Sequence, residues 1–159
     1  MFDCVVLLQA AGSPAGPAGR CIGVVASRAA VLCVSDESVA ELSEVLNRPG
    51  VRRKFHQLTD ERVADFLAWL DTIAVRVDPV LHVFTLKRDP DDSKYLDLAH
   101  AAGAKFIVSR DNDLLDLMTG TDADAVAFRT TCPDLVILDP VAFLQTVQPP
   151  TVDPNTPSN

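Results

Sequence analysis

Short apolar runs alternate with helical patterns along most of this chain, and this alternation constrains the fold more than any other feature. Each run is rich in Val, Ile, Leu or Phe and has the length of a buried strand. Strands that alternate with helices predict an α/β fold with a mainly parallel central sheet between two helical layers. We therefore expect a three-layer α/β/α sandwich. The predicted strands are residues 2–10, 29–35, 74–78, 105–109, 124–128 and 134–138.

Capping residues and apolar stripes mark the helices between these strands. Ser35 and Thr59 each precede a segment with acidic residues in its first turn and apolar residues at helical spacing. A further helix is expected to begin at Pro90, because proline suits the first helical position, and to end at Gly103. The predicted helices are residues 20–28, 36–48, 59–73, 90–102 and 139–147.

Length and charge limit what the chain can be. Its 159 residues fit one domain, which we place at residues 1–147, and the proline-rich polar tail at 148–159 is predicted to be disordered. The net charge is −8, so binding to a nucleic acid through charge alone is excluded unless a cation supplies positive charge. The four cysteines form no CxxC pair, which argues against a zinc site and a disulfide framework. Because the chain has neither a basic leader nor a membrane-spanning apolar run, we expect a cytoplasmic protein without membrane contact.

Acidic residues stand where ligands bind in such folds, beyond the carboxyl ends of the strands. Asp3 lies in the first predicted strand, where aspartate is uncommon. Asp111 and Asp113 follow the strand at 105–109 directly. On the helices, Glu41 borders an apolar stripe and Asp92 falls within one. All of these positions map to the same edge of the predicted sheet.

Each acid alone has an ordinary explanation as a capping, first-turn or boundary residue, but their joint placement predicts a site. Clustered carboxylates raise one another's pKa values unless a cation shares their charge. Mg²⁺ and Mn²⁺ prefer oxygen ligands and serve phosphoryl chemistry. Two further acids stay outside the predicted site: Asp97 falls on the opposite side of its helix, and Asp116 is interpreted as a surface or capping residue.

These residues resemble a known family. The stretch "DPDDSKYLDLAHAAGAKFIVSRDNDLLDL" is similar to the most specific part of the PIN domain, and a weaker likeness extends over residues 1–120. The most similar branch is that of toxins from toxin–antitoxin systems. The resemblance implies an α/β/α fold and an RNase that depends on Mg²⁺ or Mn²⁺. It also implies an antitoxin protein as a partner and pairing as a homodimer.

The acids of the family match this chain residue by residue. In chain order, they fall on Asp3, Glu41, Asp92, Asp111 and Asp113. Ser109 stands where a Ser or Thr usually precedes the last pair, and it supports the site. One departure is Val5, which replaces an Asn that commonly follows the first acid by two residues.

The reaction implied by the resemblance is hydrolysis of RNA phosphodiesters inside the RNA chain. One or two metal ions are held by Asp3, Asp92 and Asp111, and Glu41 and Asp113 contact them directly or through water. A water molecule then attacks the phosphodiester in line, and the ions stabilise the charge that develops. No histidine is placed to act as a separate general base.

Two groups of basic residues have alternative interpretations. The basic residues before Phe55 are Arg52, Arg53 and Lys54. They either hold RNA phosphates while Phe55 stacks on a base, or form a solvated face with Phe55 in the core. Arg110 either contacts RNA or pairs with Asp111.

Other functions remain as alternatives. A degenerate PIN module that binds RNA or a protein partner without cutting is favoured by Val5. A response-regulator receiver domain needs two acids after strand one and a lysine that ends a later strand, whereas Lys105 begins its strand. A phosphatase with a nucleophilic aspartate needs a DxD motif at strand one, where this chain has "DCV". Both of these last two alternatives are disfavoured.

Overall fold

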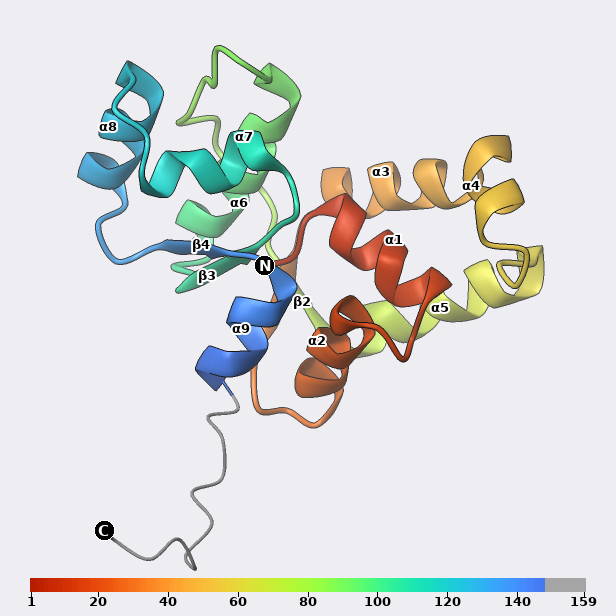
Figure 1. Ribbon diagram of the computed structural model, residues 1–159. Helices are drawn as coiled ribbons and strands as arrows, with labels where there is room; N and C mark the ends of the chain where they lie inside the picture. Colours follow the sequence, from red (N-terminus) through yellow and green to blue (C-terminus); the bar gives the residue numbers. More distant parts are fainter. Residues whose placement is uncertain (148–159) are drawn as a thin grey trace, which may run out of the picture.

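The computed structural model describes residues 1–147 and shows an α/β fold in which all strand pairings of the described chain are parallel (Figure 1). The strands are β1 (Leu32–Val34), β2 (Ala74–Arg76), β3 (Phe106–Val108) and β4 (Val136–Leu138). The helices are α1 (Cys4–Gly12), α2 (Pro17–Ala26), α3 (Asp36–Leu46), α4 (Pro49–Lys54), α5 (Asp60–Ile73), α6 (Ser93–Ala101), α7 (Asn112–Leu115), α8 (Ala123–Thr131) and α9 (Pro140–Val147). Two 3-10 turns are η1 (Pro90–Asp92) and η2 (Asp116–Met118). The parallel strands between helices confirm the predicted fold class.

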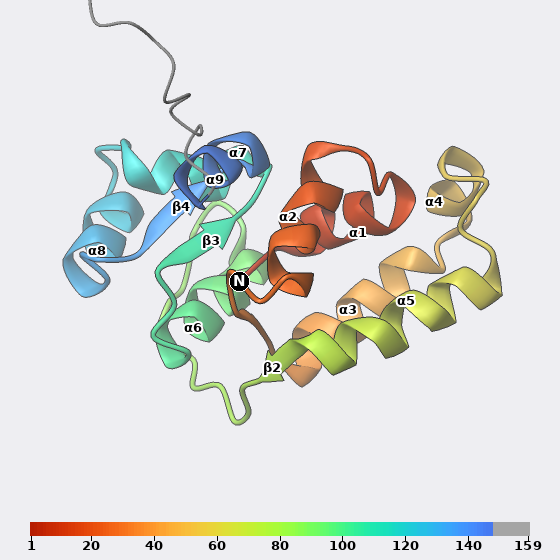
Figure 2. The same ribbon diagram turned by 90° about the horizontal axis from the view of Figure 1, so that it is seen from below.

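The strands form two parallel pairs with helices on both sides. β1 pairs with β2 and β3 with β4, and Phe2 makes an isolated parallel bridge to Val108 in β3. Helix α6 packs against β1 and β3, whereas α9 packs against β4 and α2. Figures 1 and 2 show α6 and α9 on opposite sides of the β3–β4 pair. This arrangement is the predicted three-layer sandwich, and α3, α4 and α5 extend from it as an arm.

Local capping places the helices close to their predicted positions. The Ser35 hydroxyl accepts the backbone N–H of Ser38 at 3.1 Å, and α3 begins at the next residue. Thr59 caps α5 in the same way. Gly103 lies just beyond α6 with a φ of 57°, a left-handed conformation that glycine adopts without strain. These three helix boundaries confirm the sequence interpretation.

Two predicted strands are helices instead. In the run 2–10, only Phe2 keeps a strand-like bridge, because Asp3 accepts the N–H of Val6 at 2.7 Å and begins α1. The run 124–128 lies inside α8, which Asp122 caps by accepting the N–H of Ala125 at 3.0 Å. Periodicity cannot separate strand from helix in such short apolar runs, and here a capping aspartate decides. Both strand predictions are therefore wrong.

The remaining predictions about the chain have mixed outcomes. The tail at 148–159, predicted to be disordered, lies outside the described residues. All four cysteines fall within residues 1–147 and carry free thiols. Among the described helices, none combines the length and the apolar character that crossing a bilayer requires.

Candidate metal centre

Asp3 stands at the carboxyl edge of the strands because the N-terminal segment pairs with β3. The backbone N–H of Asp3 donates to the carbonyl oxygen of Val108 at 3.0 Å. The side chain is buried and has two tasks. Its Oδ1 caps α1, and its Oδ2 accepts the Ser109 hydroxyl and the N–H of Arg110, the latter at 3.3 Å. Asp3 is thus fixed beside the residues that follow β3.

Ser109 links the first acid of the chain to the acids that follow β3. Its buried hydroxyl donates to Asp3 and accepts the backbone N–H of Asp111 at 2.9 Å. Asp111 in turn caps the short helix α7 by accepting the N–H of Asp113 at 2.8 Å. The positions of Asp3 and Asp111 are therefore coupled through a single serine oxygen.

Asp92 reaches the same place from the start of α6. Its Oδ2 is buried and has no hydrogen-bond partner among the described residues. Burial and, to a smaller extent, the charges of Asp111, Asp89 and Asp3 together raise the pKa of Asp92 from 3.8 to about 7. The pKa of Asp3 is raised as well, mainly by burial, while its hydrogen bond from Ser109 acts in the opposite direction. The charge of Asp111 thus disfavours the ionised forms of both Asp3 and Asp92.

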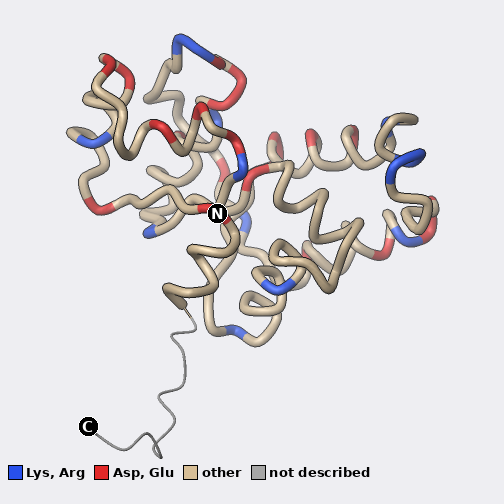
Figure 3. Tube along the Cα trace, viewed as in Figure 1, with Lys and Arg blue, Asp and Glu red and all other residues tan. Residues whose placement is uncertain are grey.

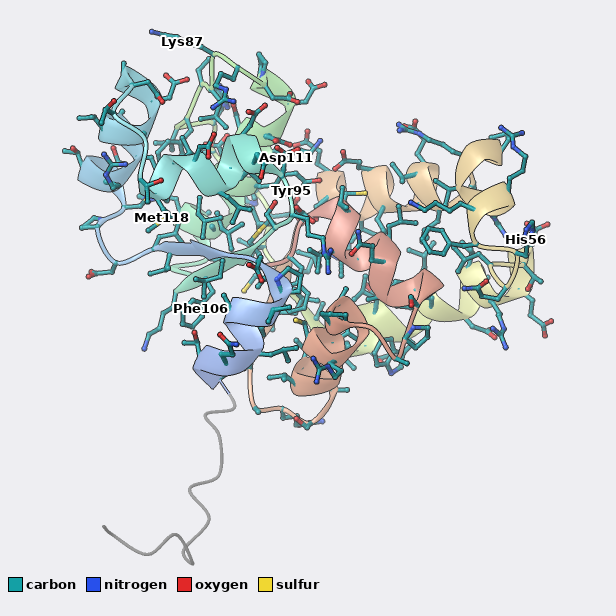
Figure 4. The ribbon with its side chains drawn as sticks, viewed as in Figure 1. His56, Lys87, Tyr95, Phe106, Asp111 and Met118 are labelled. Carbon is teal, nitrogen blue, oxygen red and sulfur yellow. The ribbon has the colours of Figure 1, made fainter. Side chains whose placement is uncertain are left out.

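Glu41 joins these acids from the middle of α3. Its Oε2 accepts the hydroxyl of Tyr95 at 2.5 Å and lies 3.1 Å from Nζ of Lys94. The same Tyr95 hydroxyl accepts the backbone N–H of Cys4, the first residue of α1, at 3.1 Å. Figure 4 shows Tyr95 and Asp111 in the middle of the molecule, at the level of the N-terminal end of α1. Glu41 is therefore connected to the Asp3 end of α1 through one hydroxyl.

Asp113 differs from the other acids because an arginine takes its carboxylate. Nη2 of Arg88 lies 2.6 Å from Oδ1 of Asp113, and Nη1 lies 3.2 Å from Oδ2 of Asp116. Asp116 is exposed, as the sequence indicates for a surface residue. Arg88, in the loop before η1, thus neutralises the charge of Asp113, which is one of the two acids that follow β3.

The donor set fits a hard divalent cation. As placed within residues 1–147, no three His, Cys, Asp or Glu side chains converge closely enough to hold a metal ion. The carboxylates of Asp3, Asp92 and Asp111 nevertheless repel one another, and Oδ2 of Asp92 is buried without a donor. Carboxylate oxygens are the ligands that Mg²⁺ and Mn²⁺ prefer, and a bound cation removes the repulsion.

The basic residues suggested for RNA binding lie in two different regions. The Arg52 side chain is largely buried and donates hydrogen bonds to the carbonyl oxygens of Leu46 and Leu58. Arg52 therefore connects parts of the arm formed by α3, α4 and α5. Arg53 and Lys54 are exposed on the same arm. Arg110 is exposed directly beside Asp111.

Figures 3 and 4 show how far the arm lies from the acids. Basic residues gather at the α4 end of the molecule, and the labelled His56 lies there, remote from Asp111. The Phe55 ring packs against Gly12, where a Cβ would come within 2.5 Å of it. This packing favours the interpretation in which Phe55 belongs to the core.

Sequence reasoning missed three residues of this region. Lys94 and Tyr95 follow Asp92 by two and three positions. The helical spacing of Tyr95 from Asp92 was the available signal. Arg88 lies in a loop and carried no such signal.

A comparison with known protein families now places this geometry. The family model of the PIN domain matches residues 1–113, which include every acid of the centre. The chain belongs to the PIN domain family. PIN domains are generally nucleases, and they typically use divalent metal ions. The comparisons with curated proteins and with solved structures found no match.

Proposed function

We propose that this PIN domain is an endoribonuclease that depends on Mg²⁺ or Mn²⁺. The observation that carries the proposal is Oδ2 of Asp92, a buried carboxylate oxygen that has no donor within residues 1–147 and experiences the charges of Asp111 and Asp3. Burying such a group is costly unless a ligand compensates it. A divalent ion compensates all three acids at once, and it suits a protein whose net charge is −8.

In this proposal, Asp3, Asp92 and Asp111 hold the ion, and Glu41 contributes directly or through water. When bound, the ion supplies positive charge to the scissile phosphate and lowers the pKa of the attacking water. Ser109 keeps Asp3 and Asp111 at a constant separation. Because Asp113 is paired with Arg88 and Glu41 with Lys94, we assign both a weaker role than Asp3, Asp92 and Asp111.

In this proposal, exposed basic residues bind and orient the RNA. Arg110 is exposed beside the acids and is suited to contact a phosphate that flanks the cleaved bond. Arg53 and Lys54 lie farther away and are suited to a more distant part of the RNA. Arg52 contributes to the arm that carries them.

The test is Mn²⁺-dependent cleavage of a mixed RNA pool by the wild type and by Asp92→Asn. Altering a residue that contacts a metal ligand costs about 10–100-fold in activity. We expect the wild type to cut the RNA, and Asp92→Asn to lose more activity than this because Asp92 is itself a proposed ligand. The matched control is Asp91→Asn, because Asp91 is adjacent but exposed. Equal cleavage by the wild type and Asp92→Asn would contradict the proposal.

A second candidate is a PIN module that binds RNA or a protein without cutting. It is favoured by Val5, whose side chain is 42% exposed on the first turn of α1 and offers no hydrogen bond. No cleavage by the wild type, together with retained binding of the same RNA pool, identifies this module. Restoration of cleavage by Val5→Asn links the loss to this position.

The role as a toxin, the antitoxin partner, the homodimer and the cytoplasmic location are finer parts of the proposal. The family membership supports them only in outline. Expression of the wild type should arrest growth, and Asp92→Asn should relieve the arrest. An adjacent open reading frame whose small product binds the protein and stops cleavage supports the antitoxin. Sedimentation of the purified protein measures its oligomeric state.

A further inference from the structure

The hydroxyl of Tyr95 connects three elements that carry acids. The Tyr95 side chain is buried in α6, with 3% of its surface exposed. Its hydroxyl donates to Oε2 of Glu41 in α3 at 2.5 Å and accepts the N–H of Cys4 in α1 at 3.1 Å. A buried hydroxyl is costly unless it is hydrogen-bonded, and both partners of this one belong to the acid-bearing region.

Three acids of the proposed centre are linked to Tyr95, one by direct contact and two through a short stretch of chain. Cys4 directly follows Asp3, so the hydrogen bond anchors the first turn of the helix that Asp3 caps. Asp92 precedes Tyr95 by three residues, which is about one helical turn. Glu41 is contacted directly. A residue needed only to fill the core has no requirement for this oxygen.

The contacts also divide the two oxygens of Glu41. Tyr95 and Lys94 both contact Oε2, and Nζ of Lys94 lies 5.3 Å from the centre of the Tyr95 ring. Within residues 1–147, Oε1 accepts no hydrogen bond. Tyr95 thus hydrogen-bonds directly to one oxygen of the Glu41 carboxylate. The face of its ring also lies against Lys94, which contacts the same oxygen.

We propose that Tyr95 is a positioning residue of the metal centre, which orients Glu41 through Oε2 and leaves Oε1 for the cation. This inference rests on the proposed metal-dependent function. Residues that hydrogen-bond to metal ligands fix the orientation of those ligands. Tyr95 also ties the α1 end at Asp3 to the same hydroxyl, so one oxygen aligns ligands from three elements.

The first experiment measures Mn²⁺ affinity by calorimetry in a double-mutant cycle of Tyr95→Phe and Glu41→Gln. Tyr95→Phe keeps the buried ring and should weaken Mn²⁺ binding about 10–100-fold. Because Tyr95 acts through Glu41, the double variant should bind little more weakly than Glu41→Gln alone. Additive losses, or no loss in Tyr95→Phe, overturn the inference.

The matched control is Ser93→Ala, which removes another buried hydroxyl from the same helix. Ser93 accepts the N–H of Leu86 at 3.0 Å, and within residues 1–147 its hydroxyl makes no hydrogen bond to the acids. Its Mn²⁺ affinity should stay at the wild-type value. A loss equal to that of Tyr95→Phe overturns the inference, because both would then report only a disturbed α6.

A second measurement needs no metal. In the metal-free protein, hydrogen exchange at the Cys4 amide should be faster in Tyr95→Phe than in the wild type, because its acceptor is gone, and unchanged in Ser93→Ala. Unchanged exchange in Tyr95→Phe overturns the hydrogen-bond link. A wild type that binds Mn²⁺ but cuts no RNA contradicts the nuclease alone, and the cycle still decides on Tyr95. A wild type that binds no Mn²⁺ overturns both proposals.

Discussion

Asp92 and Asp97 belong to the same helix, but their surroundings differ. Asp92 directly precedes the first residue of α6, and Asp97 lies in the middle of α6. Asp97 is 3% exposed, and its Oδ1 accepts the N–H groups of Val83 and Phe84, each at 2.8 Å. Its Oδ2 lies 2.7 Å from Nδ1 of His82. Asp92 instead has a buried oxygen without any donor in the described chain and is surrounded by other acids. The protein thus supplies both oxygens of Asp97 with partners, whereas within residues 1–147 it supplies none to Oδ2 of Asp92.

The largest expected effect on stability belongs to Asp97. Asp97→Ala leaves two backbone N–H groups without an acceptor and should lower the free energy of unfolding by about 2–6 kcal/mol, at about 1–3 kcal/mol for each group. Urea denaturation measures this loss. Asp97→Asn keeps an acceptor oxygen and should lose less. If Asp97→Ala is as stable as the wild type, the division between the two aspartates is wrong.

Stabilisation by Mn²⁺ should also distinguish Asp92 from Asp97, and here the larger effect is expected at Asp92. Mn²⁺ at about 100 times its Kd should raise the free energy of unfolding of the wild type by about 2.7 kcal/mol. Asp97→Asn should keep this gain, and Asp92→Asn should lose most of it because a ligand is missing. Thermal unfolding with and without Mn²⁺ measures the effect, and Mg²⁺ serves as the second ion. A full gain in Asp92→Asn contradicts the proposed centre.

The affinity for Mn²⁺ should depend on pH through Asp92. Its pKa is raised to about 7, so below this pH a proton competes with the ion. We expect Mn²⁺ affinity to fall by about tenfold, or about 1.4 kcal/mol, for each pH unit below 7. Calorimetry between pH 5 and 8 measures the slope. A flat profile shows that Asp92 does not hold the competing proton.

The metal-free protein should show the opposite trend in stability. A carboxyl whose pKa is higher in the folded state holds its proton more tightly there. The contribution of Asp92 to stability is therefore present below about pH 4 and lost as the pH rises through about 7. Asp92→Asn should remove this part of the pH dependence, and Asp97→Asn should keep it.

The smallest effect is expected at His82. Its side chain is 67% exposed, so the contact with Asp97 is open to solvent screening. His82→Gln should cost less than about 1 kcal/mol of unfolding free energy and leave Mn²⁺ affinity unchanged. A loss as large as that of Asp97→Ala shows that the imidazole, and not the two backbone N–H groups, is the main partner of Asp97.

The parts of the fold that could be predicted depend on near neighbours in the chain. Ser35 and Thr59 mark the starts of α3 and α5 because a capping oxygen and the N–H group that donates to it lie within three residues. The strand predictions for residues 2–10 and 124–128 were wrong because a short apolar run is compatible with both a strand and a helix. In both, a single aspartate at the helix start decides the conformation.

The candidate site was predictable in its composition but not in its connections. The sequence placed Asp97 on the far side of its helix from Asp92, and the structure buries it there against the 82–84 loop. The pairing of Asp113 with Arg88 joins helix α7 to the loop before η1, and no local sequence pattern indicates it. Desolvation of Asp92 likewise depends on what packs over it, which residue spacing does not encode.

By itself, the sequence determined which acids stand at the strand ends and on which helical turns, because caps and periodicity act over a few residues. Only the tertiary structure decided which of these acids have partners. Ser109 contacts Asp3 across 106 residues, and Tyr95 contacts Glu41 across 54. Such contacts exist only after the helices and strands have packed, and the same packing withholds donors from Asp92. Burial and long-range hydrogen bonding therefore decide how each carboxylate is held, which patterns over a few residues do not encode.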